Sequence, residues 1–302
     1  MDSSKKTSLL SDLALLFVAA VWGGGFVVVK DALDILTPMY LMSIRFILAS
    51  AALYLFLHRK IGKINVCELK RGSVVGLLLF LAFAAQTVGL QYTTASKQGF
   101  LTATYVVMVP IIHFFIYKKV PSKTVVASSL LSIVGIGLIS LNSTLAINVG
   151  DLLTLICAFF FASHIISIEY FAKNMDVFKL AFLQIAVAAI LFTVSALILE
   201  PMPTVITTKG WLLLAYMAVF ATFLCFTVQT VAQKYTTSSH ASIILSLESV
   251  FAAVFGVLLL SEDMTPSMIL GSCIIFVAIL LIEGDFSSIM LKKNEVKKKH
   301  FL

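Results

Sequence analysis

Charged residues are scarce in this sequence. Only 12% of its 302 residues are charged, whereas 60% are apolar, and the mean hydropathy is +1.04. A soluble domain averages about 25% charged residues, and no soluble core could enclose this much apolar surface. The composition therefore excludes a soluble globular protein and indicates an integral membrane protein, with the lipid bilayer as its surroundings.

The chain also lacks the patterns that mark enzymes, metal sites and channels. It contains no H-E-x-x-H, no G-x-S-x-G, no acidic metal cluster and no long polar loop that could hold a soluble active site. Its four cysteines include no C-x-x-C, so neither a zinc site nor a disulfide is indicated. No repeated filter motif points to a pore. We expect no enzymatic activity, no cofactor and no bound metal, and we keep a membrane enzyme and a channel as weaker alternatives.

What the chain does contain is a series of apolar runs. Each is about 20 residues long, or roughly 30 Å as a helix, which matches the hydrocarbon thickness of a bilayer. Backbone groups in lipid must pair within their own segment, so helices are expected. The ten predicted spans are residues 12–30, 38–57, 72–92, 97–117, 122–141, 150–171, 178–199, 210–232, 240–260 and 266–284.

Basic residues are unevenly distributed between the loops that join these runs. There are 22 Lys and Arg against 15 Asp and Glu, a net charge of +7, and most of the basic residues fall on alternate loops and at the two termini. This distribution follows the positive-inside rule for membrane proteins. It argues against a nucleic-acid partner, because the basic residues form short loops between spans. We expect a multi-pass protein of a bacterial cell membrane with both termini in the cytosol.

One sequence signature occurs twice. Residues 80–96 are FLAFAAQTVGLQYTTAS and residues 223–239 are FLCFTVQTVAQKYTTSS, at an offset of 143 residues. Chance similarity between apolar spans would repeat Leu, Val and Ala, but rarely the polar order Gln-Thr followed by Tyr-Thr-Thr. Two halves derived from one unit explain the match. The starts of the halves also correspond, with Asp12-Leu13 matching Asp151-Leu152 at an offset of 139 residues.

The predicted fold is an all-α polytopic membrane protein of ten transmembrane helices, arranged as two inverted five-helix repeats. Each half holds five spans, an odd number, so the halves are expected to insert with opposite orientation. The first repeat covers residues 1–146, the second covers residues 147–286, and residues 287–302 form a basic cytosolic tail. Inverted repeats place a binding site near the midplane and one gate at each face. The sequence leaves the oligomeric state open.

Several motifs resemble those of the EamA-type permeases of the drug/metabolite transporter superfamily. They are WGGGF at residues 22–26, Pro38 with Arg45 and Phe46, Gly99-Phe100-Leu101 before Val109-Pro110, and LESVFAAVFGVLLLSED at residues 247–263. The last run departs from the family pattern in having Ser249 where proline is usual. The resemblance covers nearly the whole chain and implies a ten-helix bundle around a central cavity.

The resemblance also implies a function. Members of that family move small metabolites, often outward, so we expect a transporter of a small-molecule substrate that works by alternating access. Export of amino acids or related metabolites is the favoured expectation. Nucleosides, polyamines and drugs are the alternative substrate classes.

Polar side chains within the spans are the candidates for substrate binding, because each needs a partner or water inside the membrane. Gln86 and Gln229 occupy equivalent places in the two halves, and both can donate and accept hydrogen bonds. Arg45 could bind a carboxylate, pair within the protein or extend toward the interface. Each candidate also has a structural alternative, namely packing or a hydrogen bond between helices. The predicted substrate-binding residues are Trp22, Arg45, Gln86, Thr102, Tyr105, His164 and Gln229.

A second group is expected to serve gating or coupling. Glu248 is a carboxyl deep in the ninth span, where it could carry a proton or make a structural hydrogen bond near a gate. We favour the structural role and transport driven by the substrate gradient. Pro110 removes a backbone donor and is expected to kink the fourth span. The group comprises Gly24, Tyr92, Pro110, Tyr235 and Glu248.

Overall fold

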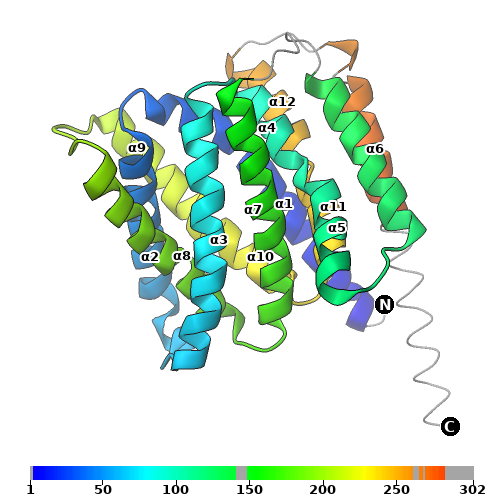
Figure 1. The fold of residues 1–302 in the computed structure, drawn as a ribbon, viewed down its shortest axis with the longest axis horizontal. Helices are drawn as coiled ribbons and strands as arrows, with labels where there is room; N and C mark the ends of the chain where they lie inside the picture. The colour runs from blue at the N-terminus through cyan, green and yellow to red at the C-terminus, as the bar shows by residue number, and fades with distance from the viewer. Residues whose placement is uncertain (1–2, 141–147, 261–264, 268, 283–302) are drawn as a thin grey trace.

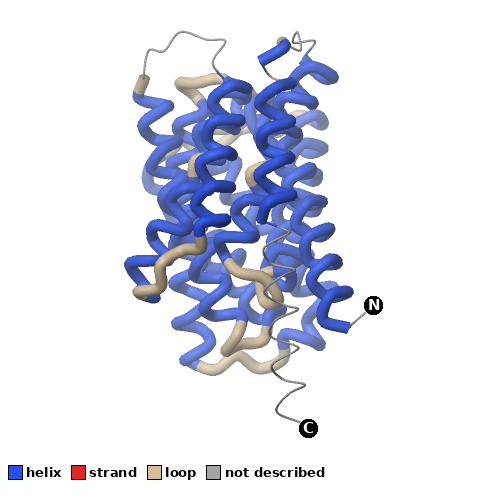
Figure 2. The backbone as a smooth tube through the Cα atoms, turned by 90° about the vertical axis from the view of Figure 1, so that its right-hand side faces the viewer, coloured by secondary structure: helices blue, strands red, loops and turns tan. Residues whose placement is uncertain are grey.

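The protein is a bundle of helices that run roughly along one direction (Figure 1 and Figure 2). The computed structural model describes residues 3–140, 148–260, 265–267 and 269–282. Within these ranges the regular structure is helical and no strand occurs. The all-α prediction is confirmed for this part of the chain.

The helices fall into two similar series along the chain. The first half contains α1 (Ser3–Leu33), α2 (Pro38–Ile61), α3 (Val66–Leu90), α4 (Ala95–Ala103), α5 (Tyr105–Tyr117) and α6 (Lys123–Ser140). The second half contains α7 (Val149–Ala172), α8 (Val177–Leu199), α9 (Thr208–Tyr216), the π-helix η1 (Met217–Leu224), α10 (Cys225–Ala232), α11 (Ser238–Leu245), α12 (Glu248–Leu260) and a further helix over Ile269–Ile282. Three of the predicted spans are thus built from consecutive short helices.

Eight helical segments among the described residues are long and apolar enough to cross a membrane. They correspond to the first four predicted spans and to the sixth through ninth. The fifth and tenth predicted spans correspond to shorter apolar helices, Lys123–Leu138 and Ile269–Ile282, which fall short of the roughly 20 residues that a straight span needs. These two helices pack against each other at Gly135 and stand together at one edge of the bundle (Figure 1). The ten-span count and the inverted arrangement therefore remain predictions.

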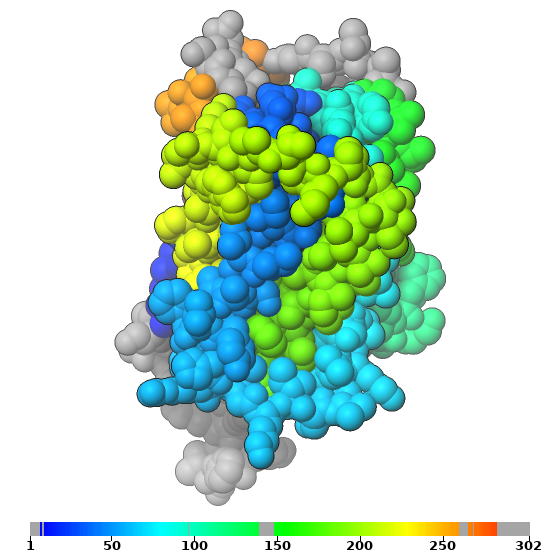
Figure 3. Space-filling model, turned by 90° about the vertical axis from the view of Figure 1, so that its left-hand side faces the viewer, coloured from blue at the N-terminus to red at the C-terminus, as the bar shows by residue number. Residues whose placement is uncertain are grey.

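Helix α1 occupies a central position, in contact with α10, α11, α12 and η1. Helix α2 packs on α8, and α3 packs on both α7 and α8. Figure 3 shows the face that α2 and α8 form together. Apolar side chains such as Phe56 and Ile198 are exposed on these two helices. A surface of this kind suits contact with lipid.

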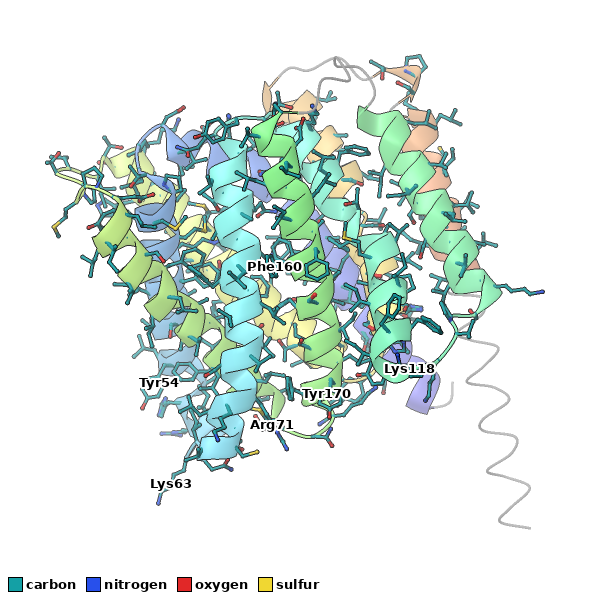
Figure 4. All side chains as sticks on the ribbon, viewed as in Figure 1. Tyr54, Lys63, Arg71, Lys118, Phe160 and Tyr170 are labelled. Atoms are coloured by element: carbon teal, nitrogen blue, oxygen red, sulfur yellow. The ribbon has the colours of Figure 1, made fainter. Side chains whose placement is uncertain are left out.

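Basic side chains gather toward one end of the bundle. Figure 4 places Lys63, Arg71 and Lys118 there, near the turn between α2 and α3 and at the end of α5. All three belong to the loops that the charge pattern assigns to the cytosol. Which face of the membrane this end occupies remains a prediction.

The repeated Tyr-Thr-Thr signature has a local structural role. Its second threonine caps the next helix in both halves, because Thr94 Oγ1 accepts a hydrogen bond from Lys97 N and Thr237 Oγ1 accepts one from His240 N, both at 3.2 Å. Each cap closes a tight turn between two long helical segments. We call these the α3–α4 turn (residues 91–94) and the α10–α11 turn (residues 233–237).

The helices that follow the two turns are interrupted at equivalent places. One break lies at Thr104, whose Oγ1 donates to Leu101 O at 2.6 Å. The other lies at residues 246–247, where Ser246 Oγ donates to Ile243 O at 2.7 Å. Hydroxyl groups that bond to nearby carbonyls compete with regular helix geometry. The interruption of the fourth predicted span thus lies more than one turn before Pro110, and α5 continues through that proline.

Candidate functional site: a central cavity

A cavity lies inside the bundle, among α1, α2, α3, α4, α5, α7, η1, α10 and α12. Its empty space, including the part open to solvent, is about 690 Å³. All of the predicted substrate-binding residues line it, together with Glu248: Trp22, Arg45, Gln86, Thr102, Tyr105, His164 and Gln229. The structure brings these residues to one place, and their role in binding stays a prediction.

Trp22 is fixed at the cavity wall by its indole N–H. Its Nε1 donates to Ala221 O in the π-helix η1 at 2.9 Å, and its ring centroid lies 5.0 Å from that of Phe226. Thr222 Oγ1 donates to Met217 O, five residues earlier, at 2.8 Å. A π-helical turn of this kind leaves backbone groups open to other partners and is frequent at functional sites. Trp22 therefore has its polar atom occupied and its ring available to the cavity.

The glycines after Trp22 let α1 approach α12. A Cβ on Gly23 would clash with the Phe251 side chain and lie 2.8 Å from Glu248 O, so a larger residue would push the two helices apart. A Cβ on Gly24 would lie 3.3 Å from the Phe255 ring. Gly25 has open space beside it and lines the cavity. Gly24, which we expected to serve gating, thus packs between helices.

Arg45 is buried, with 3% of its surface exposed, and it lines the cavity. Its Nε donates to Thr222 Oγ1 at 2.6 Å, and its guanidinium carbon lies 4.7 Å from the Phe83 ring centroid. One of its amino groups lies 3.9 Å from Met42 Sδ. No carboxylate of the described residues forms an ion pair with it. A buried guanidinium without a counter-ion is costly in a membrane, so an anionic group in the cavity would stabilise it.

The two equivalent glutamines have different partners. Gln86 Nε2 donates to Thr102 Oγ1 at 3.2 Å, which joins α3 to α4 beside the cavity. Gln229 is 1% exposed, and its Oε1 has no hydrogen-bond partner within the described part of the chain. Buried polar atoms normally find partners. Gln229 Oε1 is therefore a free acceptor at the cavity wall.

His164 starts a chain of hydrogen bonds that leads away from the cavity. Its Nε2 lies 2.8 Å from Gln184 Oε1, Gln184 Nε2 donates to Thr230 Oγ1 at 2.9 Å, and Thr230 Oγ1 donates to Phe226 O at 2.6 Å. The last bond fixes the direction of the chain, so His164 Nε2 carries the proton and donates to Gln184. His164 Nδ1 is then an acceptor in the neutral ring, and it has no partner among the described residues.

Tyr105 and Glu248 occupy equivalent positions of the repeat, each directly after a helix break. Both are 3% exposed, and they are near enough to interact electrostatically. Neither Tyr105 Oη nor Glu248 Oε1 has a hydrogen-bond partner of regular geometry in the described ranges. A pseudo-twofold axis between two inverted repeats would pass between such a pair.

The other predicted gating residues lie away from the cavity. Tyr92 is 58% exposed on the α3–α4 turn, and its equivalent Tyr235 is 47% exposed on the α10–α11 turn. Pro110 is buried in α5 and lines a separate apolar groove between α5 and α6. Their placement leaves a gating role open for the two tyrosines, which mark opposite turns.

Several cavity residues were not among the predicted ones. Gln98 in α4 is fully buried, and its Nε2 donates to Gln86 O and to Thr154 Oγ1. A glutamine within an apolar run is a signal that the sequence offered, although its equivalent position holds Ala241 and the repeat does not mark it. Phe83, Phe161 and other apolar lining residues have no sequence signal that separates them from the lipid-facing ones.

Comparison with known proteins identifies the family. Residues 9–141 and 148–284 match the EamA-like transporter family. An uncharacterized transporter of Archaeoglobus fulgidus is 38% identical over 274 residues, which cover 91% of this chain and 86% of that protein. The uncharacterized transporter YoaV of Bacillus subtilis is 25% identical over 286 residues, which cover 91% of this chain and 97% of that protein.

The fold also has a counterpart among solved structures. A crystal structure of another protein superposes with a TM-score of 0.75 at 12% sequence identity, over 92% of this chain and 96% of that chain. At this identity the likeness shows the fold alone. The family match over most of the sequence, together with a relative at 38% identity, shows that the chain belongs to the EamA-like transporter family.

Proposed function

We propose that this transporter exports amino acids, or closely related zwitterionic metabolites, across the cell membrane by alternating access. The single observation that carries the proposal is Arg45, a buried cation on the cavity wall without a carboxylate partner among the described residues. A guanidinium binds a carboxylate through two parallel hydrogen bonds. The carboxylate of an amino acid would supply the missing counter-ion.

Glu248 supplies the complementary charge. It lines the same cavity, no described cation pairs with it, and its Oε1 is unpaired. We therefore extend its expected role from gating or coupling to contact with the substrate's ammonium group. One acidic and one basic group at a single cavity favour a zwitterion over a polyamine, which would need several carboxylates.

Neutral polar groups complete the proposed site. Gln229 Oε1 and His164 Nδ1 are unpaired acceptors within the described structure, so both favour a solute that carries N–H or O–H donors. The Trp22 ring offers an apolar or aromatic surface for the substrate's side chain. Residues Thr102 and Tyr105 add hydroxyl groups at the breaks of the fourth predicted span.

We propose further that the chain comprises two inverted five-helix repeats, residues 1–146 and 147–286, followed by a basic cytosolic tail at residues 287–302. The two segments that match the family, 9–141 and 148–284, support a division at this point. Contacts of α4 with α12 and of α5 with α11 support opposite orientations, because the two interrupted helices then run in opposite directions. With ten spans, both termini lie on the same side, which the basic loops assign to the cytosol.

A competition assay with the purified protein in proteoliposomes tests the substrate class. Uptake of a radiolabelled amino acid mixture is measured with an excess of unlabelled amino acids, amino-acid amides, decarboxylated amines, nucleosides or a polyamine. We expect the amino acids to compete and the amides and amines to compete weakly, because these lack the carboxylate that Arg45 binds. Competition by nucleosides or a polyamine, with none by amino acids, would overturn the proposed substrate class.

A further inference from the structure

Two tight turns lie at opposite ends of the bundle, and each is held by charged side chains. The contacts of α1 establish the positions, because Asp12 near its start contacts His240 after the α10–α11 turn, and Lys30 near its end contacts the α3–α4 turn. A helix rises 1.5 Å per residue, so these two contacts are about 27 Å apart along α1.

The α3–α4 turn is held by one lysine and one aspartate from other helices. Lys30 Nζ donates to Leu90 O at 2.7 Å and to Thr93 O at 3.0 Å. Asp151 at the start of α7 pairs with Lys97 at 2.7 Å and accepts a hydrogen bond from Thr93 Oγ1 at 3.1 Å. The Asp151 side chain is only 3% exposed, so this ion pair is partly shielded from solvent.

The α10–α11 turn is held in a matching way by two acidic residues. Glu169 at the end of α7 accepts from Ser238 N at 2.7 Å and pairs with Lys173 at 2.7 Å. Asp12 near the start of α1 lies 3.1 Å from His240 Nε2, and both side chains are buried. Each turn is thus fastened at two points, once to α1 and once to α7.

The two sets of contacts use equivalent positions of the repeat. Asp12 matches Asp151 and Lys30 matches Glu169 at the offset of 139 residues, and Lys97 matches His240 at the offset of 143. The partners differ in kind, because Lys30 donates to carbonyls whereas Glu169 accepts from an amide. The retained feature is the place of the contact, which indicates that fastening these turns to α1 and α7 matters for both halves.

We propose that the two turns are the gates of the transporter, and that the Lys97–Asp151 and Asp12–His240 pairs are clamps that keep the respective gate closed. The proposal rests on the alternating-access function proposed above. Release of one clamp frees the α3–α4 turn, and release of the other frees the α10–α11 turn. Opening one end while the other stays clamped is the asymmetry that alternating access requires.

Two cavity residues lie directly below the gates. Phe26 is about one helical turn from Lys30, and Ile165 is about one turn from Glu169. Both line the cavity and occupy equivalent positions in the repeat. Movement of the α3–α4 turn away from α1 and α7 would expose Phe26, and movement of the α10–α11 turn would expose Ile165.

Site-specific labelling tests the clamps without any substrate. Phe26→Cys and Ile165→Cys are each placed in a background whose four native cysteines are replaced by alanine, and a membrane-impermeant maleimide is added to intact cells or to inside-out vesicles. Asp151→Asn should raise the labelling rate at Phe26→Cys about tenfold, which corresponds to about 1.4 kcal/mol in the opening equilibrium. It should lower labelling at Ile165→Cys from the other face. Asp12→Asn should have the reverse effect.

A charge-reversed pair serves as the matched control and covers a loss of folding. Lys97→Asp combined with Asp151→Lys retains an ion pair at the same place, so its labelling should return to the parent rates. The proposal is overturned if Asp12→Asn and Asp151→Asn change both reporters in the same direction, because that result means general loosening of the bundle. Unchanged labelling in both variants overturns it as well. The readout involves no transported solute, so it separates this proposal from the substrate class.

Discussion

Replacement of Arg45 by glutamine is expected to weaken transport of amino acids selectively. Among the described residues that line the cavity, Arg45 is the only lysine or arginine, so no neighbouring cation can take over its charge. Removal of one partner of a buried charge pair costs about 2–5 kcal/mol. A loss of about 3 kcal/mol corresponds to roughly a hundredfold increase in KM, since each 1.4 kcal/mol is a factor of ten.

A substrate pair shows whether the carboxylate is the group that Arg45 binds. In proteoliposomes the parent protein should take up an amino acid with a much lower KM than its primary amide, which has nearly the same shape but no charge. Arg45→Gln should remove this difference by raising the KM of the acid toward that of the amide. Arg59→Gln is the matched control, because Arg59 lies on the same helix but is exposed at its far end.

Two results would refute the reasoning. In one, Arg45→Gln retains the parent KM for the amino acid while Arg59→Gln behaves likewise, which means that the buried guanidinium makes no contact with substrate. In the other, the acid and the amide lose affinity equally. A structural role for Arg45, through Thr222 Oγ1 and the Phe83 ring, would then explain its burial.

Three further predictions follow from the spans and the cavity. Impermeant reagents should label Lys209→Cys and Arg59→Cys from opposite faces of the membrane, because five predicted spans separate these exposed positions; labelling from one face contradicts the inverted repeat. Trp22→Ala and Gln229→Ala should each lower transport by about tenfold at normal membrane abundance, the effect of losing about 1.4 kcal/mol, and full flux in both would remove them from the site. Glu248→Gln should weaken uptake of amino acids but not of acids without an amino group, and an imposed pH gradient should not concentrate substrate in the parent protein. Uphill accumulation driven by pH, lost in Glu248→Gln with counterflow preserved, would make Glu248 a proton carrier.

The spans and the polar cavity residues were predictable for one physical reason. A polar side chain inside an apolar run needs a partner or water, so it faces the interior of the bundle. This argument selected Arg45, Gln86, His164 and Gln229, and the structure brings all of them to one cavity. The repeat was visible because Gln-Thr and Tyr-Thr-Thr are unusual in apolar spans, and the capping role of Thr94 and Thr237 explains part of it.

Other features had no signal of that kind. The breaks of the fourth and ninth predicted spans lie at Thr104 and at residues 246–247, where neither proline nor glycine occurs, whereas Pro110 lies within a continuous helix. The π-helix η1 depends on bonds to other helices, including the one from Trp22. The Asp12–His240 pair joins residues 228 positions apart, and no local pattern predicts such a contact.

Counterflow in proteoliposomes tests the central claim most directly. Vesicles containing the purified protein are loaded with an unlabelled amino acid, and uptake of a trace of the same labelled amino acid is followed over time. A carrier with alternating access predicts saturable uptake that the internal amino acid stimulates, followed by a transient overshoot of the label. Uptake that rises linearly with concentration and is indifferent to internal amino acid would contradict the account, because it would show an open pathway.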